Sequence, residues 1–462
     1  MLISYFNNVK KLDDGANVIT LGDKMEIVKS RIKDATVTII FAVLAGTILM
    51  LLAYCVPISL IEKHVVESVN IFENEGWGYG FAPRVSTSYP DHVTDALMIC
   101  EAVSPRTNSL VHDAMNNTWI GLEGYGHVDT LIHVFSDDSY DDVSVCPYPR
   151  YWHGYLIWLK PLLAIMSYSE IRILAMWIQI AFLFIALHEL LEKDKRLAVA
   201  FFCSFMFLNP ITSAMSMQFA SIYCLTLVLT FLILKCEAYE SANCWRLFMC
   251  GGIAVAFFDF FTYPVVALGI PLVICIALKK NGSIRNDLIN VLDYSAAYFI
   301  GYGGMWCGKW IMAGFLIKEN SVSNVFVNAF NQAVYRMVAE ENESKMTAIY
   351  VLRQVLMHLN NKPMKIFALL FAVVIISIAL SKQFEVSLKY KIIPIVVVAV
   401  YPFIWYILVK NHSATHARIE QREMAVFIMA MMYATLLIIK RKTPGKSNKK
   451  RVFSKREQFQ KS

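Results

Sequence analysis

Two aspartates, Asp91 and Asp95, stand four residues apart in a polar segment that follows the first apolar stretch of the chain. This spacing puts both carboxylates on one face of a helix or of its first turn. A carboxylate just outside an apolar span can act as general base on an acceptor hydroxyl, or hold a metal that binds a phosphate leaving group. The alternative is that Thr94 or Asp95 caps a short helix over 96–103. We predict a catalytic role for Asp91 and keep both roles open for Asp95.

Imidazole and guanidinium groups gather in a second polar segment, 410–423. It contains two pairs with four-residue spacing, which are His412 with His416 and Arg418 with Arg422. Arginine binds phosphate through paired N–H donors, and histidine can donate to a leaving phosphate. We predict that these four residues bind a donor phosphate. Two alternatives stay open: a polar loop against lipid headgroups, and a zinc site made of both histidines and Glu420.

Aromatic residues close the first polar segment, and a polar turn separates two later apolar stretches. Aromatic side chains can stack on sugar rings, although they equally resemble an interfacial belt. In the turn, Asp259 is either functional or a cap for a helix that begins at Pro264. The predicted acceptor or sugar contacts are Arg150, Tyr151, Trp152, His153, Tyr155, Asp259 and Tyr263.

These side chains must be positioned by membrane helices. The chain has 462 residues, of which 57% are hydrophobic and only 17% charged. Several apolar runs reach the roughly 20 residues that cross about 30 Å of hydrocarbon. The predicted fold class is therefore all-α, a polytopic integral membrane protein with about ten transmembrane helices. The expected spans are 36–60, 170–190, 196–213, 217–235, 246–260, 263–278, 291–316, 364–381, 391–409 and 424–440.

Lysine and arginine indicate the orientation of these spans. Basic residues are dense before the first span, in alternate short loops and in the tail, which predicts that both termini are cytoplasmic. The expected parts are a cytoplasmic segment 1–35, a membrane domain 36–440 and a basic cytoplasmic tail 441–462. The extracytoplasmic loops are then 61–169, 317–363 and 410–423, so every candidate site lies on one face. The tail is best interpreted as an anchor beside anionic headgroups, and we predict no nucleic-acid partner.

Two stretches in the outer loops are too short or too amphipathic to span. Segment 154–167 is apolar and rich in aromatic residues, and 325–337 has apolar residues at helical spacing. Both are typical of helices that lie in the membrane interface.

Cys100 and Cys146 both fall in the first outer loop. An oxidising compartment would permit a disulfide between them, with two free thiols as the equal alternative. The other cysteines lie in or beside apolar spans, or in short connections, and indicate no metal site.

The layout of residues 36–215 resembles the GT-C superfamily, membrane glycosyltransferases that use polyprenyl-phosphate sugars. The similarity rests on an aromatic and histidine stretch ending at His153-Gly154-Tyr155, a short helix with Lys160-Pro161, and Arg172 opening the second span. Further motifs are similar to those of GT-C-like proteins from bacterial surface-polysaccharide loci: Thr94-Asp95-Ala96-Leu97-Met98, Phe261-Thr262-Tyr263-Pro264 and Asn411-His412-Ser413. Relatives often carry an acidic pair close to the end of the first span. This chain has Glu62 there and its aspartates about 30 residues later.

The resemblance implies an inverting-type transferase in a bacterial cytoplasmic membrane. It would move a sugar from a polyprenyl-phosphate donor to a glycan, lipid or protein acceptor at the extracytoplasmic face, among membrane lipids. No cofactor is assigned, and a divalent metal stays open. The alternatives are a transporter or flippase for a lipid-linked glycan or small solute, and an oligosaccharide polymerase. A transporter would place charges within the spans, and Lys309 is the chief candidate.

Overall fold

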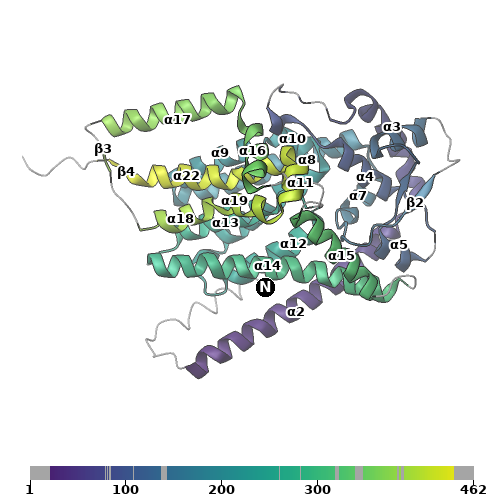
Figure 1. Ribbon diagram of the computed structural model, residues 1–462, viewed down its shortest axis with the longest axis horizontal. Coiled ribbons are helices and arrows are strands. Elements are labelled where there is room, and N and C mark those ends of the chain that lie inside the picture. The colour runs from purple at the N-terminus through teal and green to yellow at the C-terminus, as the bar shows by residue number, and fades with distance from the viewer. Residues whose placement is uncertain are drawn as a thin grey trace, which may run out of the picture.

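The computed structural model describes residues 21–441, apart from 79, 81, 83, 84, 108, 137–142, 260, 281, 318–321, 339–346, 382, 383 and 387–389. Nearly all regular structure in this part of the chain is helical. Long helices lie side by side, and short helices from residues 58–163 gather at one end of them (Figure 1). The segment 1–20 and the tail after Arg441 lie outside the described residues.

The first long helix, α2 (Leu21–Tyr54), leads directly into the group of short helices. A two-stranded antiparallel sheet lies within this group, with Trp119 of β1 opposite Cys146 of β2. The elements of the group are α3 (Ile58–Glu75), η2 (Ser86–Ser88), α4 (His92–Ala102), α5 (Leu110–Asn116), β1 (Trp119–Gly121), α6 (His127–Ser136), β2 (Ser144–Cys146) and α7 (Leu156–Leu163).

The remaining chain forms the helical bundle and the helices that cover its end. These elements are α8 (Tyr168–Lys193), α9 (Lys195–Phe207), α10 (Pro210–Met215), α11 (Met217–Lys235), η3 (Ala238–Glu240), α12 (Cys244–Phe258), α13 (Pro264–Leu278), α14 (Ile284–Leu316), α15 (Val322–Met337), α16 (Ala348–Leu359), α17 (Lys362–Leu380), β3 (Phe384–Val386), α18 (Ile392–Ala399), α19 (Tyr401–Leu408), α20 (Lys410–Thr415), α21 (Ala417–Glu420), η4 (Gln421–Glu423), α22 (Met424–Ile438) and β4 (Ile439–Arg441). Strands β3 and β4 pair antiparallel.

Four helical stretches among the described residues are long and apolar enough to cross a membrane. They are Val28–Tyr54, Tyr168–Lys193, Met217–Lys235 and Ala417–Ile438. A fifth is obtained if α16 and α17, which meet at a bend of 83°, count as one broken span. Shorter apolar helices cover Cys244–Phe258, Pro264–Leu278 and Ile392–Leu408. The helical class and the presence of membrane-length helices are thus shown, whereas the number of about ten spans stays a prediction.

Helices α12 and α14 pack closely because glycines lie at their crossing. A Cβ atom on Gly252 would stand 2.0 Å from the Tyr298 carbonyl oxygen, and one on Gly301 would stand 2.2 Å from the Met249 carbonyl oxygen. Small residues permit this backbone approach between helices. The contact fixes α14, which supplies one wall of the site described below.

The shorter helices agree in part with those expected from the sequence. The helix expected over 96–103 is present as α4 but begins at His92, and the helix expected over 325–337 lies within α15. Segment 154–167 contains the short helix α7. The stretch 196–213 is not one continuous helix, because α9 ends at Phe207 and Asn209, with a φ of 61°, precedes a new helix, α10.

Candidate functional site

Asp91 is the N-cap of α4. Its Oδ1 accepts from the Thr94 backbone N–H at 3.3 Å and its Oδ2 from the Thr94 hydroxyl at 2.8 Å. The Ser216 side chain accepts from its backbone N–H at 3.4 Å. The half-buried carboxylate also acts electrostatically on His416 and Arg418. The first and last polar segments therefore meet at Asp91, and capping leaves part of the acceptor capacity of a carboxylate unused.

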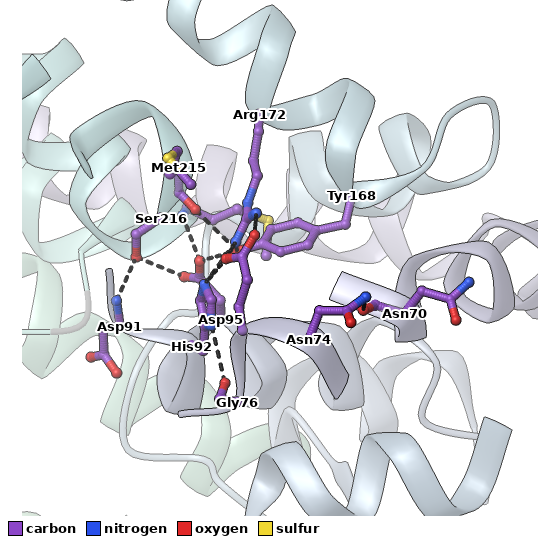
Figure 2. A network of polar contacts seen from close by, with 12 residues as sticks. Asn70, Asn74, Gly76, Asp91, His92, Asp95, Tyr168, Arg172, Met215 and Ser216 are labelled. Atoms are coloured by element: carbon purple, nitrogen blue, oxygen red, sulfur yellow. Dashed lines mark hydrogen bonds and ion pairs between the residues drawn. The ribbon is translucent and has the colours of Figure 1, made fainter. Parts of the chain in front are cut away.

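Asp95 has a structural role. Its fully buried carboxylate accepts from the Tyr168 hydroxyl at 2.5 Å and from the Ser216 hydroxyl at 3.2 Å (Figure 2). The backbone N–H groups of Met217 and Gln218, at the start of α11, donate to it at 3.0 Å. Burial raises its pKa to about 6, against the opposing hydrogen bond from Tyr168. The catalytic alternative for Asp95 is therefore not supported, because the carboxylate satisfies the orphan donors of another helix.

An ion-pair network that the sequence did not predict adjoins Asp95. Arg172 donates through both terminal nitrogens to Glu75, at 3.0 and 3.1 Å, and contacts His92 Nε2 at 2.7 Å (Figure 2). The other ring nitrogen of His92 lies 3.1 Å from the Gly76 carbonyl oxygen. Partial burial opposes ionisation of Glu75, but hydrogen bonds from His92 and Arg172 lower its pKa to about 2. The network ties α3, α4 and α8 together.

The two histidines of the last polar segment lie against each other, with ring centroids 4.6 Å apart. His412 Nε2 lies 3.1 Å from the Phe261 carbonyl oxygen and 3.3 Å from a Glu420 carboxylate oxygen. Burial and the nearby Arg336 lower the pKa of His412 to about 3. The edge of His416 reaches solvent, yet the surrounding protein and His412 lower its pKa to about 4. Both imidazoles are therefore neutral at neutral pH, when they can donate or accept but carry no charge.

The two arginines of that segment separate. Arg418 is exposed, with its guanidinium carbon 3.9 Å from the centroid of the Tyr89 ring. Arg422 is fully buried over the Phe219 ring, and one terminal nitrogen donates to the Thr87 and Tyr89 carbonyls at 3.1 and 3.4 Å. Arg418 is thus placed to meet a ligand. Arg422 holds the segment before α4 in place, which removes it from the predicted phosphate-binding set.

An aromatic cavity of about 270 Å³ lies between α14, α15 and α19, beside His412. Two arginines, Arg150 and Arg336, take part in its wall. The Arg336 guanidinium carbon lies 5.2 Å from the centroid of the Tyr151 ring and 4.6 Å from that of Phe261. The aromatic side chains that line it are Tyr151, Phe261, Phe299, Trp306, Trp310 and Trp405.

Phe261 connects the cavity to the histidines. Its ring stacks on Trp306 at 5.6 Å and lies 4.7 Å from the ring of His412, centroid to centroid. Its φ of 67° is left-handed, a conformation that costs about 1–3 kcal/mol for a residue with a side chain. Asp259 accepts from the Thr262 backbone N–H at 2.9 Å and from its hydroxyl, which stabilises this turn. Asp259 is therefore a positioning residue rather than a substrate contact.

Four other predicted contacts are buried away from the cavity. The Trp152 indole donates to the Met305 carbonyl at 2.7 Å, and the Tyr263 hydroxyl donates to that of Phe219 at 2.7 Å. His153 and Tyr155 lie against Glu101, with His153 Nδ1 2.9 Å from a carboxylate oxygen. All four side chains are at most 2% exposed. Of the predicted sugar contacts, only Arg150 and Tyr151 reach the cavity.

Cys100 and Cys146 are free cysteines, so of the two alternatives the structure has the free thiols. Cys100 points into the core of the short helices, where its thiol lies 3.9 Å from the His127 carbonyl oxygen, and burial raises its pKa. Cys146 is instead on β2, opposite Trp119.

Metal binding was one interpretation of the last polar segment. Within the described ranges, no group of three or more His, Cys, Asp or Glu side chains is arranged to hold a metal ion. The set His412, His416 and Glu420 therefore does not form the zinc site that its spacing allowed.

Two residues of the candidate site were not predicted from the sequence. They are Arg336, which lines the aromatic cavity, and Tyr89, on which Arg418 stacks. Arg336 follows the apolar residues of α15 as its only basic residue in the last turn, which was the available signal. Comparison with known proteins adds no assignment: no family model, curated protein or solved structure matches this chain.

Proposed function

We propose that this chain is a GT-C-type membrane glycosyltransferase that takes a sugar from a polyprenyl-phosphate donor. One observation carries the proposal. Asp91, the predicted base, acts electrostatically on His416 and Arg418. His416 lies against His412, which contacts Phe261 in the wall of a cavity lined by aromatic rings and two arginines. A general base, phosphate-binding cations and aromatic surfaces for a sugar or prenyl chain are the parts that such a transfer needs.

The reaction is a direct displacement. The acceptor hydroxyl oxygen attacks the anomeric carbon of the donor sugar and gives its proton to the Asp91 carboxylate. The bond between the anomeric carbon and the phosphate oxygen breaks, and polyprenyl phosphate leaves with the electron pair. The acceptor is a glycan, a lipid or a protein.

Arg336 and Arg418 are the cations for the departing phosphate, in place of the pair of arginines that the sequence indicated. Arginine supplies a positive charge, whereas His412 and His416 are neutral at neutral pH and act as hydrogen-bonding groups. Arg150 supplies a further positive charge at the cavity wall. The proposal includes a membrane arrangement. The chain would cross a bacterial cytoplasmic membrane about ten times, with both termini in the cytoplasm and the site on the extracytoplasmic face.

The test uses purified full-length protein in liposomes with radiolabelled polyprenyl-phosphate sugars and a membrane-glycan extract. Asp91→Asn is compared with Glu67→Gln, the same carboxylate-to-amide change at an exposed position of α3. We expect transfer by the wild type and by Glu67→Gln, and a loss of about 10²-fold or more in Asp91→Asn. Unchanged transfer in Asp91→Asn would contradict the proposal.

The same liposomes test the alternatives. Passage of solute or lipid-linked glycan without transfer would favour a transporter or flippase, and chain extension of a lipid-linked glycan would favour a polymerase. Lys309 gives no specific support to a transporter, because its ammonium donates to the Met115 carbonyl at 2.8 Å and to Asn117. These two bonds connect α14 to α5 and to the residue that follows it.

A further inference from the structure

A second cavity, of about 360 Å³, lies where α2 ends, on residues that the proposed transferase does not use. Its walls come from the turn after α2, from the segment between α4 and α5, and from α7. Unlike the aromatic cavity, it is lined by Lys160, Arg106, Ser104 and Asp113. The candidate span Val28–Tyr54 ends at its rim.

Lys160 is the buried cation of this cavity. The side chain is 1% exposed, although it belongs to one of the residue types that are rarely buried without a partner. Its ammonium donates to the Ala102 carbonyl at 2.6 Å and lies 4.7 Å from the centroid of the Tyr54 ring. An ammonium has three N–H donors, and the bond to Ala102 uses one.

Arg106 is the exposed cation at the rim. One terminal nitrogen donates to the Tyr54 carbonyl at 3.1 Å, at the carboxyl end of α2. This bond holds the guanidinium beside the cavity and uses one of its five donors. Burial is the larger cause that lowers the pKa of Lys160 to about 8, and the positive charge of Arg106 adds to it, so the two cations repel each other.

The acids near this pair have other partners as well. Asp113 accepts from the Thr107 backbone N–H at 3.1 Å and from the Thr107 hydroxyl at 2.9 Å, and lies 3.0 Å from His112. Glu101 attracts Lys160, but its carboxylate contacts His153 and Tyr155. Lys160 and Arg106 therefore keep unused N–H donors at the wall of one cavity, and the oxygens of a single anion would accept from both.

We propose that this cavity binds a phosphate group through Lys160 and Arg106, and that the phosphate belongs to a membrane lipid. The position at the end of a candidate span puts the cations at the depth of lipid headgroups. Arginine and lysine are also the side chains that bind phosphate oxygens most directly. The site is separate from the aromatic cavity and does not rest on the transferase proposal.

Native mass spectrometry of the full-length protein in a non-ionic detergent tests this site. Phosphatidylglycerol is compared with diacylglycerol that carries the same acyl chains but no phosphate. We expect phosphatidylglycerol to bind and diacylglycerol to bind at least tenfold more weakly, because only the former carries a phosphate. Equal binding of the two lipids would overturn the proposal.

Variants assign the binding to the cavity. Arg106→Gln changes an exposed residue, and we expect it to weaken phosphatidylglycerol binding about tenfold, the effect of one lost charged hydrogen bond. Lys160→Met keeps the buried stem and is expected to act in the same direction. Arg353→Gln, an exposed arginine on α16, is the control and should bind as the wild type does. Wild-type binding by Arg106→Gln would overturn the proposal even if Lys160→Met fails to fold.

Inorganic phosphate separates the two sources of the ligand. If millimolar phosphate displaces phosphatidylglycerol from the wild type, the cavity recognises the phosphate group whatever carries it. If phosphate does not displace the lipid while binding still depends on Arg106, the lipid is the ligand. Both results support the site.

Discussion

Arg418 stacks on Tyr89, with its guanidinium carbon 3.9 Å from the ring centroid, and so joins the last polar segment to the residues just before Asp91. The contact leaves the guanidinium exposed, and the charge of Asp91 acts on it. Stacked arginine is pre-organised, so it loses less side-chain entropy when it binds a phosphate.

Arg418→Gln should therefore raise the KM for a polyprenyl-phosphate sugar, by about tenfold to a hundredfold, while the folded state is little affected. The measurement is steady-state transfer with donor concentration varied. Arg285→Gln is the control, since residue 285 lies in the first turn of α14, about 30 Å along the helix from Trp306. A KM that rises equally in both variants would mean that Arg418 does not bind the donor.

Arg422→Met should act on stability instead. The change leaves the Thr87 and Tyr89 carbonyls without the donor that Arg422 supplies, at a cost of about 1–3 kcal/mol. We expect a lower melting temperature in detergent, together with a donor KM near that of the wild type in the folded fraction. A raised KM at unchanged melting temperature would return Arg422 to the phosphate site.

Asp95 should make stability fall with rising pH. The folded state holds the carboxyl proton with a pKa of about 6, whereas an unperturbed aspartate titrates at 3.8. The folded protein therefore binds more protons than the unfolded chain between these values, and its contribution to stability is full below pH 4 and lost as pH rises through 6. The expected slope is about 1.4 kcal/mol per pH unit inside that window.

The check on Asp95 is the difference in melting temperature between wild type and Asp95→Asn, measured from pH 4 to pH 7. Glu75 is present in both proteins, so its own loss of stability as pH falls below 4.5 cancels in the difference. Parallel curves for the two proteins would show that Asp95 does not carry this titration.

Two glycines on one helix provide a matched pair. Gly301→Ala would place a methyl group 2.2 Å from the Met249 carbonyl oxygen, so α12 and α14 must move apart, at about 1–3 kcal/mol. Gly303→Ala meets nothing within 4 Å and should be neutral or stabilising by up to about 1 kcal/mol. Thermal unfolding of both variants in detergent measures the contrast, and equal melting temperatures would contradict the packing.

The candidate site could be predicted from the sequence as parts but not as a whole. Spacing within each segment indicated Asp91, His416 and Arg418, because such patterns are local, and their roles stay predictions. That Asp91 meets residues more than 300 positions later depends on tertiary packing, which one sequence does not reveal.

Spacing also failed where the backbone departs from a regular α-helix. Arg418 lies in α21, whereas Arg422 lies in the 3₁₀ turn η4, so a four-residue interval does not keep them on one face. The catalytic role considered for Asp95 is not supported for a different reason. Every residue of α4 from Asp95 to Ala102 is buried, so this helix lacks the amphipathic pattern that would show which of its side chains face solvent.

The Asp95 bond to the start of α11 has a consequence for how the molecule opens. Through Asp95, the short helix α4 caps the membrane-length helix α11. The two helices cannot separate without leaving these polar groups unpaired. The short helices of residues 58–163 are therefore not an independent lid. These helices and the bundle should exchange their amide hydrogens as one cooperative unit.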